Sequence, residues 1–353
     1  MGAGGDDAMG ERLQRAKLLA AAAGAPLLVM SGAATAAPQV EIRFDHYLPL
    51  TEYQVGGFAS ELTAGSLTNP VVEEDVEVEG RQVSLRIHDV FRVVDERFGL
   101  SLFIDYSEVE GRAASIHTLP NFGIPGTGQA FGVFINQPTT AFTSANVDVW
   151  QLAFAIEGDA SLYRSSFGQG ATPNANMLDI RFLAGLRVDT TNTSISHSAH
   201  AISTGGVTDV SYFTDLNETS ATPYLGLQAD YSREVQNYVF SASISGRLGA
   251  AFSCYDGADT LFSTGLANIN QQIDIGEAST NPYLSFGGAI GVRRGMFGIG
   301  LSATSEYGAI RDPNVFREDS VASPGGGFEL VKTALDPEAL WTHRIGANLV
   351  IDF

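Results

Sequence analysis

The sequence predicts an all-β fold, an antiparallel transmembrane β-barrel of about 10–12 strands. Three observations carry this prediction. Many segments alternate between apolar and small or polar residues over ~10 residues, the length at which a tilted strand crosses a bilayer. The connections between these segments fall into a short class and a long, polar class. The last ten residues, RIGANLVIDF, form one more alternating segment that ends on Phe353.

The bulk composition excludes several other classes of protein. The chain has 353 residues, of which only 17% are charged, and its formal net charge is −20. Nucleic acid is therefore not an expected partner, because its recognition needs a basic surface. The single cysteine, Cys254, excludes an intrachain disulfide. No motif indicates a cofactor, and we expect none.

A secretory signal peptide is expected at residues 1–36. The basic residues Arg12, Arg15 and Lys17 precede an uncharged run from 18 to 30, and small residues follow it. This is the three-part layout of an export signal. The run is shorter than the ~20 residues of a membrane-spanning helix. An amphipathic helix is the alternative, but the segment lacks a polar face. The mature chain, 37–353, is then expected to form the barrel.

Nine segments alternate clearly enough to be predicted as strands. They are 83–94, 97–107, 146–157, 177–189, 222–232, 238–252, 282–293, 296–307 and the closing strand 340–353. Since bacterial barrels have an even number of strands, a further first strand is expected within 40–67. In the segment 83–94, Asp89 falls on the apolar face, which indicates either a β-bulge or an early strand end.

The connections predict the orientation of the barrel. Short turns join the strands near 95–96, 233–237 and 294–295, with a middling connection at 158–176. Long polar loops are expected at 108–145, 190–221, 253–281 and 308–339. With the C-terminus in the periplasm, every long loop lies outside the cell and every tight turn lies in the periplasm, as in outer-membrane barrels.

Aromatic residues lie near the ends of the apolar faces, where interfacial girdles require them. The expected lipid-interface set is Phe98, Tyr106, Tyr231, Tyr238, Phe252, Tyr307, Trp341 and Phe353. A soluble β-sandwich is the alternative, because its strands also alternate. Strand length, the export signal, the loop asymmetry and the terminal phenylalanine together favour the barrel.

The opposite face of the strands carries charges that would be costly in lipid. We therefore expect the following residues to line the lumen: Arg86, Asp105, Asp179, Arg181, Arg187, Asp189, Asp230, Arg247, Glu306 and Arg344. They either pair into a network that plugs a narrow barrel or line an aqueous path. Glycines and serines on the same face slightly favour open space, and the acidic total hints at a preference for cations.

Other candidate sites are weaker. His197 and His200 form the only close histidine pair, and in a predicted polar loop without a nearby cysteine we expect no metal site. The acidic run 73–79 is predicted as a solvated loop, and no EF-hand spacing is present. No serine elbow or His–Ser pair on one strand indicates catalysis, so the protein is not expected to be an enzyme.

Two stretches resemble known proteins. The terminal Phe353 on an alternating strand resembles the signal read by the barrel-assembly machinery of Gram-negative outer membranes. The segments DVWQLAFAIEGDASLYR, MLDIRFLAGLRVDT and PYLGLQADYSREVQNYVFSASISGRLGAAF are similar to the major-outer-membrane-protein-like pore-forming family of the Legionella type, over about 146–252. The resemblance implies an outer-membrane location, with lipid and the assembly machinery as partners.

Three functions follow in order of expectation. The first is a porin-like channel for passive diffusion of small hydrophilic solutes or ions. The second is a closed barrel that serves as a structural or adhesion protein through its loops. The third is a barrel hydrolase. It stays open because the residues of a catalytic triad are brought together by the fold and need not be close in the sequence.

Overall fold

The computed structural model describes residues 39–352, apart from 60–61, 64–65, 68–70, 94–97, 121, 125–132, 136, 168–175, 266–268, 314 and 320–330. These described residues are mostly β-strand. Within them, no helix is long and apolar enough to cross a membrane. The expected signal peptide at 1–36 and the terminal Phe353 lie outside the described residues.

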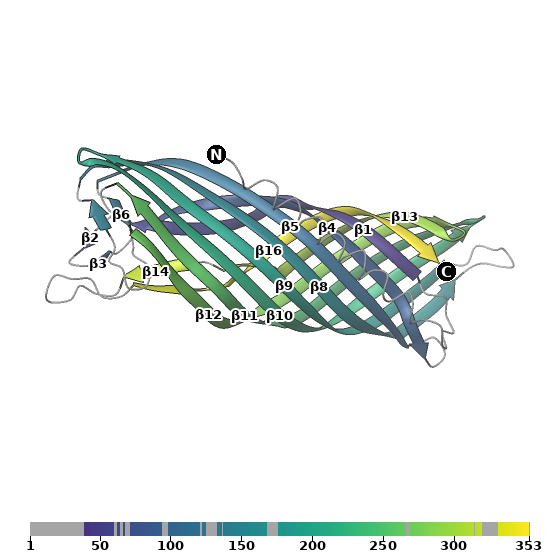
Figure 1. Ribbon diagram of the computed structural model, residues 1–353. Helices are drawn as coiled ribbons and strands as arrows, with labels where there is room; N and C mark the ends of the chain where they lie inside the picture. Colours follow the sequence, from purple (N-terminus) through teal and green to yellow (C-terminus); the bar gives the residue numbers. More distant parts are fainter. Residues whose placement is uncertain are drawn as a thin grey trace, which may run out of the picture.

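Ten long strands form a closed antiparallel ring (Figure 1). Each strand pairs with the next long strand along the chain, and β16 pairs with β1 to close the ring, from Gln39↔Asp352 to Tyr47↔Arg344. The fold class is therefore confirmed, with ten strands in the barrel. The strands are β1 (Gln39–Ala59), β4 (Val71–Val93), β5 (Phe98–Leu119), β8 (Thr139–Phe167), β9 (Asn176–Ser203), β10 (Gly206–Val235), β11 (Tyr238–Thr264), β12 (Ile269–Arg294), β13 (Phe297–Asp312) and β16 (Glu338–Asp352).

The two ends of the barrel differ. We call the end that holds Gln39 and Asp352 the terminal end, and the opposite end the distal end. Tight turns at the terminal end join β10 to β11 and β12 to β13, and Gln236 and Gly295 adopt positive φ there (58° and 59°). Short hairpins lie at the distal end (Figure 1). They are β2 (Leu62–Thr63) with β3 (Ser66–Leu67), β6 (Phe122–Ile124) with β7 (Val133–Ile135), and β14 (Val315–Asp319) with β15 (Val331–Leu335).

The barrel is much longer than a membrane is thick. Strands β8 to β12 have 26–30 residues each, whereas a tilted strand crosses a bilayer with ~9–11. On β8, the outer face carries the exposed apolar side chains Leu152, Phe154 and Ile156. On the distal side of this run, the outward residues Asn146 and Asp148 are polar, and Phe142 further along is an exposed exception. The terminal half therefore forms the membrane-spanning belt, and the distal half projects beyond it.

The structure corrects the predicted loops. Most of 190–221 and 253–281 is strand, and only Thr204 and Gly205 separate β9 from β10. The prediction of long loops at those residues was wrong. The reason is a change of face along each strand. In the belt apolar residues point outward, as Leu152 does, whereas in the projection they point inward, as Val147 and Val149 do. A search that follows the apolar residues along one face stops where they change to the other face. It therefore takes this change of face for the end of the strand.

Strand β4 shows two further local outcomes. Asp89 has a positive φ of 55°, and the β4–β5 register shifts between Ile87 and Phe91. The predicted β-bulge is thus confirmed, and it explains why Asp89 breaks the alternation. The acidic run 73–79, predicted as a solvated loop, is instead part of β4. Its valines, Val76 and Val78, are buried in the barrel.

Candidate functional site

The interface aromatics lie at two levels on the outer face. Phe98, Tyr231 and Tyr238 are exposed near the terminal end of their strands. The other described members lie further from the terminal end, at the distal edge of the belt: Tyr106, Phe252, Tyr307 and Trp341. The Tyr307 and Trp341 rings are 5.2 Å apart, and Trp341 stacks on His343. Amphipathic rings at two levels are the arrangement that a bilayer requires of a barrel.

The residues expected to line the lumen all lie on inward-facing positions of their strands, and nearly all of them have partners. Buried members are Asp179, Arg187, Asp189, Glu306 and Arg344. Partly buried members are Arg86, Asp105, Arg181, Asp230 and Arg247. Sequence parity predicted the face on which these charges lie, but it gave no information on which charge contacts which.

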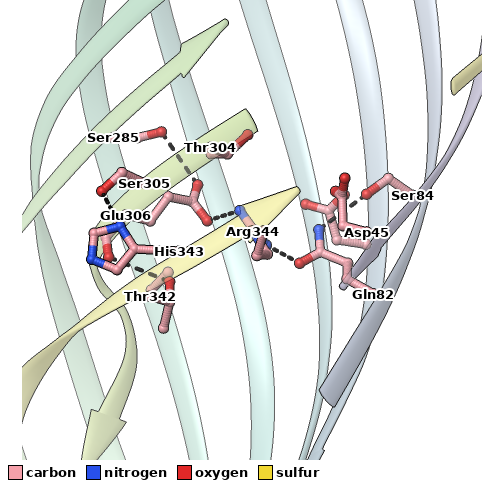
Figure 2. Close-up of polar contacts among 12 residues, drawn as sticks. Asp45, Gln82, Ser84, Ser285, Thr304, Ser305, Glu306, Thr342, His343 and Arg344 are labelled. Atoms are coloured by element: carbon pink, nitrogen blue, oxygen red, sulfur yellow. Dashed lines mark hydrogen bonds and ion pairs between the residues drawn. The ribbon is translucent and has the colours of Figure 1, made fainter. Parts of the chain in front are cut away.

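A layer of polar side chains, here called the charged layer, crosses the barrel near the distal edge of the belt. Arg344 on β16 donates hydrogen bonds to Glu306 on β13 and to Gln82 on β4, so its guanidinium reaches past β1 (Figure 2). Glu306 also accepts hydrogen bonds from the Tyr283 hydroxyl at 3.1 Å and the Ser285 hydroxyl at 3.3 Å. This carboxylate is buried and is matched by an arginine and two hydroxyls.

The same layer continues to the opposite wall. Arg187 on β9 donates to Asp189 at 3.3 Å and to the amide oxygen of Gln151 on β8 at 3.1 Å. Gln151 in turn donates to the carbonyl oxygen of Ala309 on β13 at 2.8 Å. In the ring, β8 and β13 are separated by β9 to β12 on one side and by β5, β4, β1 and β16 on the other. The Gln151–Ala309 bond therefore spans the lumen from wall to wall.

A second barrier, here called the apolar plug, fills the barrel on the distal side of the charged layer. Every one of the ten barrel strands contributes to it, and Tyr53 and Val76 have no accessible surface at all. Its buried or partly buried members are Tyr47, Tyr53, Val55, Val76, Val78, Val109, Ala113, Ala145, Val147, Val149, Ile195, Leu216, Tyr255, Ile275, Ile310, Val315, Leu335 and Leu340. Side chains with no accessible surface have no contact with solvent, so the interior is densely packed at this level.

The hairpin β14–β15 completes the plug. Strands β13 and β16 end at Asp312 and Glu338, so they do not continue the wall beside the distal halves of β12 and β1. Val315 of β14 and Leu335 of β15 pack into the plug beside this position. The backbone N–H of Leu335 donates to Glu277 of β12 at 3.0 Å. Sequence reasoning missed the plug, although the inward valines of 76–78 and 147–149 were a readable signal for it.

The terminal half of the interior is polar and hollow. Arg247 on β11 makes two hydrogen bonds across the lumen to Glu157 on β8, at 2.7 and 3.1 Å. Around this pair lies a cavity of about 140 Å³, and a second of about 380 Å³ lies between the strand ends. Either volume is far above the ~10–15 Å³ that one water molecule needs. Both cavities lie on the terminal side of the charged layer.

A small polar cluster lies inside the distal half. Glu74 of β4 accepts hydrogen bonds from Ser115 at 2.5 Å and from Thr143, and its other contact is His117 Nε2 at 3.0 Å. Burial by itself would raise the pKa of Glu74, but the hydrogen bonds from Ser115, Thr143 and His117 outweigh it and hold the pKa below the ordinary value. The carboxylate is therefore ionised and ties β4, β5 and β8 together.

The pH dependence of this cluster follows from the direction in which the pKa of Glu74 is shifted. Since the pKa of Glu74 is lower in the folded state, its stabilising contribution is complete above the unfolded pKa of about 4.3 and is lost as the pH falls through the folded pKa. We expect hydrogen exchange at the distal ends of β4, β5 and β8, corrected for intrinsic rates, to speed up on acidification from pH 6 to pH 3. In Glu74→Gln, exchange at these strand ends should not speed up on acidification. If it speeds up as much as in the wild type, other carboxyl groups cause the effect.

The histidine pair does not share a site. His197 faces inward and is buried, whereas His200 faces outward and contacts Asp209 at 2.6 Å. Residues three apart on a strand lie on opposite faces, which explains the separation. In the described part of the chain, no group of three His, Cys, Asp or Glu side chains is arranged to hold a metal ion. Cys254 is exposed, on β11 rather than in a loop.

Comparisons with known proteins identify no family. No protein-family model matches the chain, and no curated protein sequence matches it. Among solved structures, the outer membrane protease OmpT from Escherichia coli matches with 11% identity and a TM-score of 0.43, covering 92% of this chain and 100% of that chain. The P. putida toluene transporter TodX matches with 9% identity and a TM-score of 0.21, covering 90% of each chain. A Pseudomonas aeruginosa FadL homologue matches with 10% identity and a TM-score of 0.20, covering 90% of each chain. Similarities this distant carry no information on activity.

Proposed function

We propose that the protein is a Gram-negative outer-membrane barrel with a closed interior, whose distal half projects from the cell as a structural or adhesive surface. The apolar plug carries this proposal, because all ten strands contribute side chains to it and these side chains are buried or partly buried. The charged layer adds a second barrier, with Gln151 bonded to the opposite wall. The apolar belt, together with the export signal predicted at 1–36, supports the outer-membrane location.

Passive diffusion of small hydrophilic solutes or ions is the second candidate. The polar cavities of the terminal half favour it, since they give a solute a path from the periplasm to the charged layer. Diffusion through the whole barrel requires both the charged layer and the apolar plug to move. Membership of the major-outer-membrane-protein-like pore-forming family is part of this second candidate, and it rests on the pattern over about 146–252.

We do not propose an enzyme. Ser115, His117 and Glu74 come together, but the hydroxyl and the imidazole both contact the carboxylate, so the imidazole is not placed to take the serine proton. Ser305 does contact His343, at 2.9 Å, on the outer face. Among the described residues, no acid contacts this imidazole to orient it.

Two partners follow from the proposed location. The apolar belt contacts outer-membrane lipid. The C-terminal strand β16 is proposed as the segment that the barrel-assembly machinery reads, and in the folded protein it is paired with β13 and β1.

Labelling a cysteine inside the barrel tests the closure. Ser243 lines the polar cavity of the terminal half. In a Cys254→Ser background, Ser243→Cys should react with a membrane-impermeant maleimide only from the terminal side of oriented proteoliposomes. Asn217→Cys, at an exposed outward position of the projection, is the matched control and should react only from the distal side. Labelling of Ser243→Cys from the distal side would favour the diffusion channel.

A further inference from the structure

The polar cavity in the terminal half adjoins a larger one. It has a volume of about 140 Å³ and lies directly below the charged layer, with Glu306 in its lining. The larger cavity of about 380 Å³ lies between the strand ends. Both are lined by Glu41, His88, Arg181, Gln228, Ser243 and Ala289, so the two spaces adjoin. A small molecule in the larger cavity therefore reaches the smaller one without crossing either barrier.

Most charges around this cavity are matched by the protein itself. Arg43 contacts Asp45 at 2.7 Å and donates to Thr304 at 2.6 Å. Arg247 holds Glu157 with two hydrogen bonds.

The acids beside the cavity are equally engaged. Arg181 contacts Asp179 at 3.0 Å and Asp159 at 3.5 Å. Glu41 contacts His88 at 3.1 Å and accepts from Asn348 at 2.8 Å.

Arg86 is the exception. It lines the cavity and its charge attracts Glu41, yet among the described residues it donates no hydrogen bond and forms no ion pair within 4.0 Å. Its Nε is buried and has no hydrogen-bond partner. The guanidinium lies over the Phe103 ring, 5.3 Å from its centroid, so one of its faces is covered by carbon. Glu41, its partner across the β1–β4 ladder, is already held by two other side chains.

A guanidinium that faces a polar cavity without an ion pair of its own is available to a ligand of opposite charge. Arginine presents a planar fork of donors that matches a carboxylate or a phosphate, and stacking on an aromatic ring fixes that fork in place. The hydroxyl groups of Ser101 and Ser243 line the same cavity and supply further donors. We infer that the cavity binds a small oxyanion, a carboxylate or a phosphate group, through Arg86. This inference reverses, for the barrel interior, the cation preference suggested by the acidic composition.

Calorimetric titration of the folded wild-type barrel in detergent with inorganic phosphate, and separately with acetate, tests the inference. Wild-type protein should bind at least one of the two anions saturably. Arg86→Gln should weaken that binding by roughly tenfold to a hundredfold, the effect of losing a charge-assisted hydrogen-bond pair. Arg81→Gln is the matched control: it removes the same charge from the same strand, at an outward position where the side chain is exposed. It should leave the affinity unchanged.

Three results would overturn the assignment: no saturable binding of either anion to the wild type, wild-type affinity in Arg86→Gln, or an equal loss in Arg81→Gln. If Arg86→Gln does not fold, Arg86→Lys replaces it. Lysine keeps the charge but not the fork, so it should bind the anion more weakly than the wild type while the barrel stays intact. Equal affinity in the lysine variant would contradict recognition by the guanidinium. Binding in detergent needs no transport, so the result is independent of whether the barrel is closed.

Discussion

Glu306→Ala should lower the free energy of unfolding by about 3–5 kcal/mol, the usual cost of removing one partner from a buried ion pair. Without the carboxylate, Arg344 keeps its charge in a buried position and loses its main partner there. The hydroxyl groups of Tyr283 and Ser285 lose their acceptor as well. Denaturant unfolding of the barrel in lipid or detergent measures the change, provided that refolding is reversible.

Two variants make this prediction specific. Glu108→Ala removes a carboxylate that also contacts an arginine, Arg81 at 3.4 Å, but on the outer surface. It should cost no more than about 1 kcal/mol, as exposed pairs do. The double variant Glu306→Leu with Arg344→Met removes both buried charges and should recover most of the lost stability. An equal loss in Glu306→Ala and Glu108→Ala would show that the charged layer is not a buried network.

The membrane-spanning part of this fold could be predicted from the sequence because lipid imposes a strict alternation on it. In the segment 296–307, Ile299 and Leu301 face outward and are exposed, as their parity indicates. Charged residues at intervening positions, such as Glu306, were correspondingly placed inside. The alternation within one segment predicts only the face on which a side chain lies. The partners of Glu306 on β16 and β12 could not be predicted from it, because they depend on the order of the strands in the ring and on their register.

The closure of the barrel interior could not be predicted from the sequence in the same way. On β10, Leu216 points inward in the projection, whereas Leu225 points outward in the belt. The apolar face therefore changes within one strand, and a search for a single alternation ends at the change. The small residues Gly298 and Ser243 favoured open space, and such space does exist in the terminal half. The plug that blocks it is built in part from segments that had been assigned to loops, which hold Tyr255 and Ile275.

Electrical recording from planar bilayers tests the closed interior most directly, because ions are the smallest probes of a continuous aqueous path. The wild-type protein is refolded, and its folded state is verified by a difference in gel mobility between unheated and heated samples. After insertion, the closed barrel predicts a flat trace without discrete conductance steps, since all ten strands contribute side chains to the apolar plug that blocks the interior. Reproducible single-channel steps from the folded wild type would contradict the closed interior and would establish the passive channel in its place.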